Sequence, residues 1–227
     1  MRRQGVEASM RKPGGRPTRE QAGVLEMQIL EGARSVFCRS GFANASLEEI
    51  ALRLGVSKHT IYRRFPNKAA LLDAVVEQDL GRFRAALVAA AKEGSGALDA
   101  LRRMAGRYVR IGSSRDYAAF YLSVSAEAAL SATLRGRLAE WSRSALEPLV
   151  AALAEAQASG ALRPGHTESA CDILVDLLEG ANNRARLRRD AAADGEEQQA
   201  LFEQRWAVFL AAFGTVPLSP EETRPGN

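Results

Sequence analysis

The sequence predicts an all-α fold, and three features of its 227 residues support this prediction. Apolar residues recur with the 3.6-residue period of amphipathic helices from about residue 20 to residue 213. Ala and Leu supply much of the apolar content and favour helices, whereas aromatic residues make up only 6%. No segment alternates apolar and polar residues in the way that half-buried strands do. We therefore expect helices throughout and no sheet.

The composition excludes several other classes of protein. No apolar run approaches the ~18 residues of a membrane-spanning helix, so we expect no membrane partner. The N-terminal arginines are not followed by an apolar segment, which argues against a secretory signal. Cys38 and Cys171 lie far apart in helical segments, which argues against a disulfide framework. The expected location is a reducing cytoplasm.

The N-terminal part of the chain contains signals for short helices. Residues 1–19 are rich in Arg, Gly and Pro without an apolar period, so we expect a disordered basic arm. A first helix begins near residue 20 and ends at Gly41, which can take a left-handed C-terminal cap. Ser46 and Glu49 have the spacing of a capping box at the start of a second helix, which ends at Gly55.

The following helices are delimited in the same way. Ser57 can cap a third helix, which is brief because Pro66 disfavours helical geometry at the preceding residue. Asn67 can cap a long connector helix over residues 67–93. Glycine-containing breaks then separate five further predicted helices, at 97–111, 115–130, 133–159, 167–188 and 196–213.

Charge is distributed unevenly along the chain. Residues 1–68 contain 13 Lys and Arg against 6 Asp and Glu, whereas residues 69–227 contain 18 against 21. A basic N-terminal part on a mildly acidic body favours a polyanionic partner, nucleic acid before a membrane surface. The alternative is that the arginines only keep a flexible arm soluble.

The segment from Ser46 to Lys68 has the spacing of a helix-turn-helix, whose second helix enters the major groove of DNA. Ile61 and Phe65 are four residues apart and are predicted to face inward. Side chains of Lys, Arg and Thr can meet base edges or phosphates, and a helix N-terminus attracts phosphate. The alternative is an ordinary helix pair with a solvated charged face. The residues predicted to face outward are Lys58, His59, Thr60, Tyr62 and Arg63.

Several short motifs fall in register between residues 15 and 75. They are Gly15-Arg16-Pro17, Gly41-Phe42, Ser46-Leu47-Glu48-Glu49-Ile50-Ala51, Gly55-Val56-Ser57, Ile61-Tyr62-Arg63-Arg64-Phe65 and Asn67-Lys68-Ala69-Ala70-Leu71. Together they resemble the DNA-binding domain of the TetR family, which comprises bacterial one-component repressors. The rest of the chain is similar in length and helical layout to the family's divergent C-terminal domain, and residues 115–128 suggest its AefR-like type.

The resemblance implies a three-helix helix-turn-helix domain followed by a helical bundle that binds a ligand and dimerises. The expected organisation is a disordered basic arm at 1–19, a DNA-binding domain at 20–66, a connector helix at 67–93, a ligand-binding and dimerisation domain at 94–214, and a flexible tail at 215–227.

Residue by residue, the resemblance places Ser46 and Lys68 at phosphate-contacting helix starts. His59 stands where many members have a small residue and Arg64 where many have His, which leaves the operator sequence open. The helix pattern and the resemblance together give these candidate DNA-binding residues: Arg16, Ser46, Ser57, Lys58, His59, Thr60, Tyr62, Arg63, Arg64 and Lys68.

Aromatic residues mark two further candidate sites. The resemblance places Tyr108, Phe120, Tyr121 and Trp141 on the central helices where the family keeps its effector pocket, although each can equally fill a core. The last predicted helix carries an aromatic stripe that is either core or part of a dimer interface. The interface candidates are Ile173, Leu174, Leu177, Leu178, Phe202, Trp206, Phe209 and Phe213.

No residue is assigned a catalytic or metal-binding role, and no cofactor is expected. The two histidines, His59 and His166, have no Cys or carboxylate partners at the spacing of metal ligands. No glycine-rich phosphate loop follows a strand, because no strand is predicted. We therefore do not expect an enzyme.

The expected function is that of a homodimeric repressor, which a small-molecule effector releases from a palindromic double-stranded DNA operator. One alternative is an activator or a DNA-binding protein of the same fold that does not respond to a ligand. Another is a helical-bundle protein that binds small molecules or serves as a scaffold, with an incidental basic arm. The ordered helix-turn-helix motifs argue against the latter.

Overall fold

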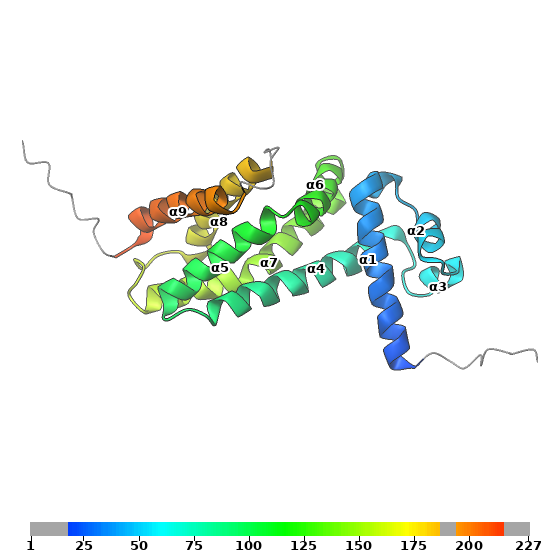
Figure 1. Ribbon diagram of the computed structural model, residues 1–227, viewed down its shortest axis with the longest axis horizontal. Coiled ribbons are helices and arrows are strands. Elements are labelled where there is room, and N and C mark those ends of the chain that lie inside the picture. The colour runs from blue at the N-terminus through cyan, green and yellow to red at the C-terminus, as the bar shows by residue number, and fades with distance from the viewer. Residues whose placement is uncertain (1–17, 187–193, 216–227) are drawn as a thin grey trace, which may run out of the picture.

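The computed structural model describes residues 18–186 and 194–215, and within these ranges the chain is all-helical, as predicted (Figure 1). The predicted tail, apart from Thr215, and the basic arm, apart from its last two residues, lie outside the described residues. The helices are α1 (Arg19–Asn44), α2 (Leu47–Leu54), α3 (Lys58–Tyr62), α4 (Lys68–Ala91), α5 (Ala97–Gly112), α6 (Arg115–Leu130), α7 (Ala132–Ala158), α8 (Thr167–Arg186) and α9 (Asp194–Phe213).

A complete capping box forms at the start of α1 rather than at the start of α2. The Thr18 hydroxyl accepts from the Gln21 amide at 3.2 Å, and the Gln21 side chain accepts from the Thr18 amide at 3.0 Å. At α2 the Ser46 hydroxyl caps as predicted, but the Glu49 carboxylate lies 3.3 Å from the Arg53 Nε instead. An ion pair one turn along the helix thus replaces the second half of the expected box.

Two glycines with positive φ shape the head of the molecule. Gly41 has φ 75° and ψ 158°, which interrupts α1 before a last turn that ends at Asn44. Gly55 is left-handed, with φ 63° and ψ 26°, and its amide donates to the Ala51 and Leu52 carbonyls at the end of α2. These conformations strain a residue with a Cβ atom, so glycine is required at both positions.

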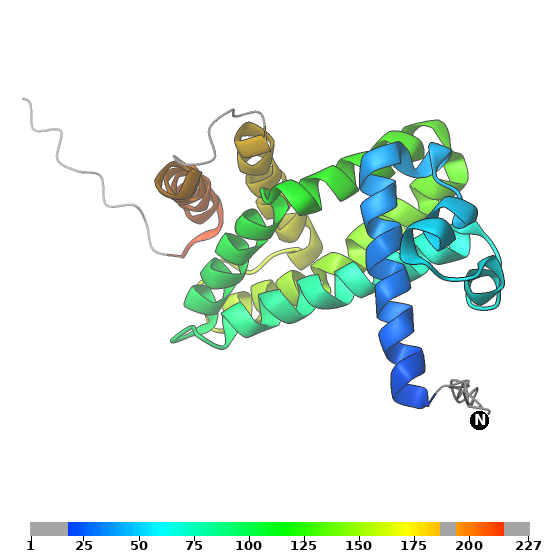
Figure 2. The same ribbon diagram turned by 45° about the vertical axis from the view of Figure 1, so that its right-hand side comes forward.

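The helices form a small head and a longer body. In the head, α1 crosses the N-terminal end of α4, and α2 and α3 lie beyond α1 (Figures 1 and 2). In the body, α4, α5 and α7 pack on one another, and α6 packs against both α1 and α7. The α8 and α9 helices pair with each other and contact α5. The long α4 therefore belongs to both parts.

The apolar core does not stop at the boundary between head and body. One cluster of buried residues holds Phe37, Ile50 and Ile61 of the head together with Phe120 and Trp141 of the body. A second cluster fills the body between α4, α5, α7, α8 and α9. Burial of apolar surface is the main favourable term in folding, so the shared cluster fixes the head against α6 and α7.

The helix boundaries agree with the prediction to within a few residues. The last helix starts at Asp194 and contains Gly195, although that glycine was expected to precede it. The helix predicted over 167–188 is described as far as Arg186. Among the described residues, no helix has the length and apolar character needed to cross a bilayer.

Candidate nucleic-acid interface and cavity

Side-chain caps hold the helix-turn-helix segment in place. The Ser46 hydroxyl accepts from the Glu49 amide at 3.0 Å, and the Ser57 hydroxyl accepts from the Thr60 amide at 3.1 Å. Asn67 caps α4 in the same way, at 2.8 Å. Each cap satisfies one of the amides that the start of a helix leaves without a partner. The five-residue α3 therefore has a defined position between two capped neighbours.

The α3 helix separates apolar from polar side chains as the sequence predicts. Ile61 is fully buried and Phe65 nearly so. In contrast, 68% of the Lys58 side chain and 43% of Tyr62 are exposed. Thr60 is half-buried, and its hydroxyl lies 2.8 Å from that of Ser57. The remaining predicted contact residues of this segment are exposed: Ser57, His59 and Arg63.

Glu48 lies beside the exposed side chains of Lys58 and Tyr62, although it was not among the predicted DNA-binding residues. Its carboxylate accepts from the Tyr62 hydroxyl at 2.9 Å and lies 3.9 Å from the Lys58 ammonium. Its own backbone amide at the start of α2 and the Tyr62 hydroxyl hold the pKa of Glu48 below its usual value. Glu48 is therefore an anion among the groups expected to meet phosphates.

Two predicted contact residues, Lys68 and Arg64, are half-buried in the head. The Lys68 ammonium donates to the carbonyl oxygens of Phe42 and Ala43, at 2.6 and 2.8 Å, and lies 4.6 Å from the centre of the Phe42 ring. Arg64 is half-buried, and its Nη1 has no hydrogen-bond partner among the described residues. Lys68 thus joins the last turn of α1 to the first turn of α4. Arg16 lies outside the described residues.

A cavity of about 300 Å³ lies in the body, and it is lined by residues of α4, α5, α6, α7 and α8. The four predicted ligand-binding residues, Tyr108, Phe120, Tyr121 and Trp141, all line it. Sequence reasoning missed two further rings in its wall, those of Phe83 and Tyr117. Their positions were recognisable only as ordinary core positions of amphipathic helices.

One end of the cavity is polar and centred on Glu179. Its Oε1 accepts from the Tyr108 hydroxyl and from the Asn182 Nδ2, each at 2.9 Å, and its Oε2 lies 3.3 Å from the Arg186 Nη1. Asn182 is completely buried. Burial, with the nearby Glu179 charge, raises the pKa of Tyr108 well above its usual value, so this phenol remains a donor.

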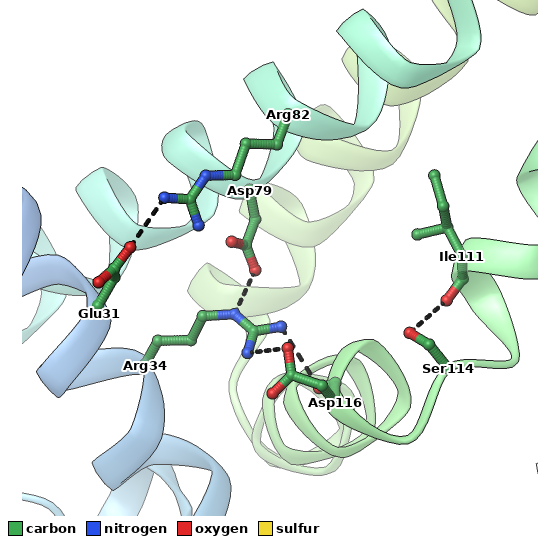
Figure 3. Close-up of polar contacts among 7 residues, drawn as sticks. All are labelled: Glu31, Arg34, Asp79, Arg82, Ile111, Ser114 and Asp116. Carbon is green, nitrogen blue, oxygen red and sulfur yellow. Dashed lines mark hydrogen bonds and ion pairs between the residues drawn. The ribbon is translucent and has the colours of Figure 1, made fainter. Parts of the chain in front are cut away.

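A second hollow borders the cavity on the side of the head. There the Arg34 guanidinium of α1 bridges Asp79 of α4 and Asp116 of α6, at 2.6 Å from each carboxylate (Figure 3). A parallel ion pair joins Glu31 to Arg82 at 3.0 Å (Figure 3). Asp79, Phe83 and Tyr117 line both hollows, so their side chains form the partition between them.

The predicted interface residues of α8 and α9 divide into a buried and an accessible set. Phe202, Trp206 and Phe209 lie in the core of the body, as do Leu174 and Leu178. Leu177 and Phe213 are half-buried, and Ile173 is 45% exposed. Val208 of α9, which the sequence analysis did not single out, is 57% exposed. The single chain thus already buries most of the aromatic stripe.

Metal-binding groups do not gather anywhere in the described part of the chain. Within residues 18–186 and 194–215, no three His, Cys, Asp or Glu side chains are placed to hold an ion. Both cysteines are free thiols.

The arrangement of α2, the turn at Gly55 and α3 is that of a helix-turn-helix. Residues 29–75 match the family described as bacterial regulatory proteins, tetR family. Over 61 residues the chain is 39% identical to the HTH-type transcriptional regulator UidR of Escherichia coli K12, a match that covers 25% of this chain and 31% of UidR. The chain thus spans about a third of the length of the curated relatives it matches.

Solved structures share the fold over most of the chain. A TetR-family regulator from Mesorhizobium loti covers 88% of this chain and 100% of its own, at TM-score 0.70 and 23% identity. FadR of Bacillus subtilis in complex with stearoyl-CoA covers 82% and 97%, at TM-score 0.68 and 20% identity. The SmeT–triclosan complex covers 89% and 100%, at TM-score 0.65 and 21% identity. At these identities the likeness establishes the fold alone.

Proposed function

We propose that the chain is a DNA-binding transcriptional regulator whose α3 helix enters the major groove. The observation that carries this proposal is the division of α3, with Ile61 buried and with Lys58 and Tyr62 projecting beside a capped helix N-terminus. Lys and Tyr side chains in this position bind phosphates and base edges. The tetR-family match of residues 29–75 supports the same role. A regulator of this kind acts in the bacterial cytoplasm, where chromosomal DNA lies.

We also propose that the regulator acts as a homodimer on a palindromic operator. Two α3 helices related by a two-fold axis would read half-sites about 34–36 Å apart, one turn of DNA. Because most of the aromatic stripe is buried within its own subunit, the proposed interface uses the outer faces of α8 and α9. The exposed apolar side chains there are Ile173 and Val208.

The cavity supports the further proposal of a repressor that a small-molecule effector releases from DNA. It lies between helices in the body, a usual place for small-molecule sites, and structures of similar fold were solved with stearoyl-CoA and with triclosan. An effector shifts the balance between two states only by its differential affinity for them. The α4 helix is the proposed link, because Leu80 and Phe83 line the cavity and its first turn packs in the head.

Fluorescence anisotropy with DNA from upstream of the protein's own gene tests the first proposal. Lys58→Ala and Tyr62→Ala should each weaken operator binding by about 1–3 kcal/mol, because each loses a contact to base or phosphate. Lys92→Ala, at an exposed lysine just after α4, is the matched control and should bind normally. Circular dichroism checks that all variants fold. Unchanged affinity in both test variants would remove α3 from the interface.

The dimer proposal has its own test. Val208→Glu should give monomers by light scattering and abolish operator binding, because a charge at the proposed interface would be desolvated. Val88→Glu, at a valine of α4 that is 42% exposed, should leave both properties unchanged. Dimers in the Val208 variant would place the interface elsewhere.

Two alternatives keep the same fold. An activator or an unresponsive DNA-binding protein would bind the operator as well, and a reporter gene in cells distinguishes them by the sign of regulation. A small-molecule-binding bundle without a role in transcription would bind no upstream DNA.

A further inference from the structure

The wall of the cavity restricts the class of effector, an inference that rests on the proposed function. Three rings of α4 and α6 form a stack. The Phe83 and Tyr117 centroids are 6.1 Å apart with 21° between the ring planes, and those of Tyr117 and Tyr121 are 6.3 Å apart with 7° between them. Tyr108 meets Phe83 edge-on at 5.6 Å. Aromatic rings attract other rings in these geometries, so the wall favours a flat aromatic ligand.

The charges of the lining oppose an anionic ligand. Asp79, Asp176 and Glu179 line the cavity, whereas Arg186 is the one basic side chain in its described lining. The Arg186 guanidinium is already bound, because it donates twice to the Gly112 carbonyl, at 3.1 and 2.8 Å, and also meets Glu179. It therefore offers no free cation to a carboxylate or a phosphate.

One carboxylate of the lining is not neutralised by a neighbour. Arg34 pairs with Asp79 from the adjoining hollow, and Arg186 pairs with Glu179. Asp176 is exposed and has no ion-pair partner among the described residues. The lining therefore carries a net negative charge at Asp176, which attracts a cation and repels an anion.

Two phenol groups in the stack can bind a polar substituent. The hydroxyls of Tyr117 and Tyr121 have no hydrogen-bond partner within the described residues. Burial raises the pKa of Tyr117 to about 12, so its hydroxyl remains protonated at neutral pH and can both donate and accept. Both side chains are half-buried, so a ligand that displaces water from these hydroxyls can take over its hydrogen bonds.

We propose that the cavity binds a compact, flat aromatic molecule that carries a hydroxyl or ammonium group and no negative charge. Its ring stacks on the Phe83–Tyr117–Tyr121 wall, and its polar group meets the tyrosine hydroxyls or Asp176. A volume of about 300 Å³ lies at the lower end of the range for small-molecule pockets and suits a compact ligand. Because the described lining holds no unpaired cation, we expect it to reject anionic ligands, including the phosphates of acyl-CoA thioesters.

Three probes that share a naphthalene ring and differ in charge test this proposal. They are 2-naphthol, 2-naphthylmethylammonium and 2-naphthoate. Isothermal titration calorimetry of the full chain at pH 7 should detect the first two, with naphthoate at least about tenfold weaker. Naphthoate that binds as tightly as the others, or failure of both naphthol and the ammonium to bind, overturns the proposal.

Two variants test whether the probes bind in the cavity and whether Asp176 favours the cationic probe. Asp176→Asn changes an exposed side chain, so the fold should survive; affinity for the ammonium should fall severalfold while that for naphthol stays unchanged. Ala145→Phe places a ring in the cavity and should abolish binding of both probes, with circular dichroism as the check on folding. Binding that survives Ala145→Phe in a folded protein, or an ammonium affinity unaffected by Asp176→Asn, contradicts the proposal.

Operator binding is measured on the same preparation, which separates this inference from the proposed function. A protein that binds naphthol but no upstream DNA retains the cavity chemistry and is not a regulator. A protein that binds its operator but neither uncharged nor cationic probe is a regulator whose effector belongs to another class.

Discussion

The same hydrogen bond occurs in the head and in the body, in opposite surroundings. In the head the Tyr62 hydroxyl donates to the Glu48 Oε1, and in the body the Tyr108 hydroxyl donates to the Glu179 Oε1, both at 2.9 Å. Tyr62 and the Glu48 side chain are each 43% exposed. Tyr108 lies in a cavity wall, and Glu179 also binds the buried Asn182.

The comparison shows that the surroundings, rather than the bond length, decide what such a bond does. Water competes for exposed polar groups, so Tyr62 and Lys58 can exchange Glu48 for a phosphate at little cost. Around Glu179 the neighbouring polar groups have few alternative partners, so loss of its carboxylate leaves them unsatisfied. The bond between Tyr62 and Glu48 can therefore be replaced by bonds to another partner, whereas the bond between Tyr108 and Glu179 stabilises the fold. Three predictions test this difference.

The largest effect, a loss of stability, is expected from removal of the Glu179 side chain. Glu179→Ala leaves the Tyr108 hydroxyl and the Asn182 amide without their acceptor and Arg186, of which 9% is exposed, without its carboxylate. The free energy of unfolding should fall by about 2–4 kcal/mol. Urea denaturation measures this fall, with Glu48→Ala as the matched control at an exposed carboxylate. A loss below 1 kcal/mol would show that water reaches this cluster freely.

The two tyrosine substitutions, Tyr108→Phe and Tyr62→Phe, should change the free energy of unfolding by smaller and unequal amounts. Tyr108→Phe removes a donor to a partly buried carboxylate and should destabilise the fold by about 1–2 kcal/mol. Tyr62→Phe removes the equivalent donor from the surface and should change stability by less than about 0.5 kcal/mol. The same denaturation experiment measures both variants. Equal losses would contradict the division between an exchangeable and a stabilising bond.

The smallest effect is expected at Glu48, where a substitution should strengthen operator binding instead of destabilising the fold. Glu48→Gln removes an anion from the proposed DNA surface and frees Lys58 for phosphate, so operator affinity should rise severalfold. The salt dependence of binding should steepen by up to about one unit of slope, since one more cation displaces counterions. Anisotropy titrations over a range of salt concentrations measure both quantities. Weaker binding would mean that Glu48 positions Tyr62 or reads a base directly.

Local signals explain how much of the fold could be predicted from the sequence. The caps Ser46, Ser57 and Asn67 each start a helix and Gly55 ends one, as expected, because these signals act within a few residues. Gly41 differs from the prediction, because it interrupts α1 without a left-handed cap and the helix continues to Asn44. The outward face of α3 follows from the four-residue spacing of the two buried residues Ile61 and Phe65. These features depend on chain geometry alone.

Contacts between distant helices explain what could not be predicted. Glu48 and Tyr62 are 14 positions apart, and Tyr108 and Glu179 are 71 apart, so no periodicity connects them. The gathering of four predicted aromatic residues around one cavity came from the family resemblance, and no spacing indicated that Phe83 would join them. The bonds of Lys68 to the end of α1 also depend on the angle between two helices.

One apolar cluster continues from the head into α6 and α7. It limits where this chain can be cut to make a hybrid with another protein. A hybrid regulator is commonly imagined as a DNA-reading part joined to a sensing part at a linker. Here Phe120, Val124 and Leu134 of the body complete the core of the head. A hybrid cut at the start of α4 would leave that core open. The smallest exchangeable unit therefore includes the matching faces of α4, α6 and α7, and a designer would need to transfer them together with α1, α2 and α3.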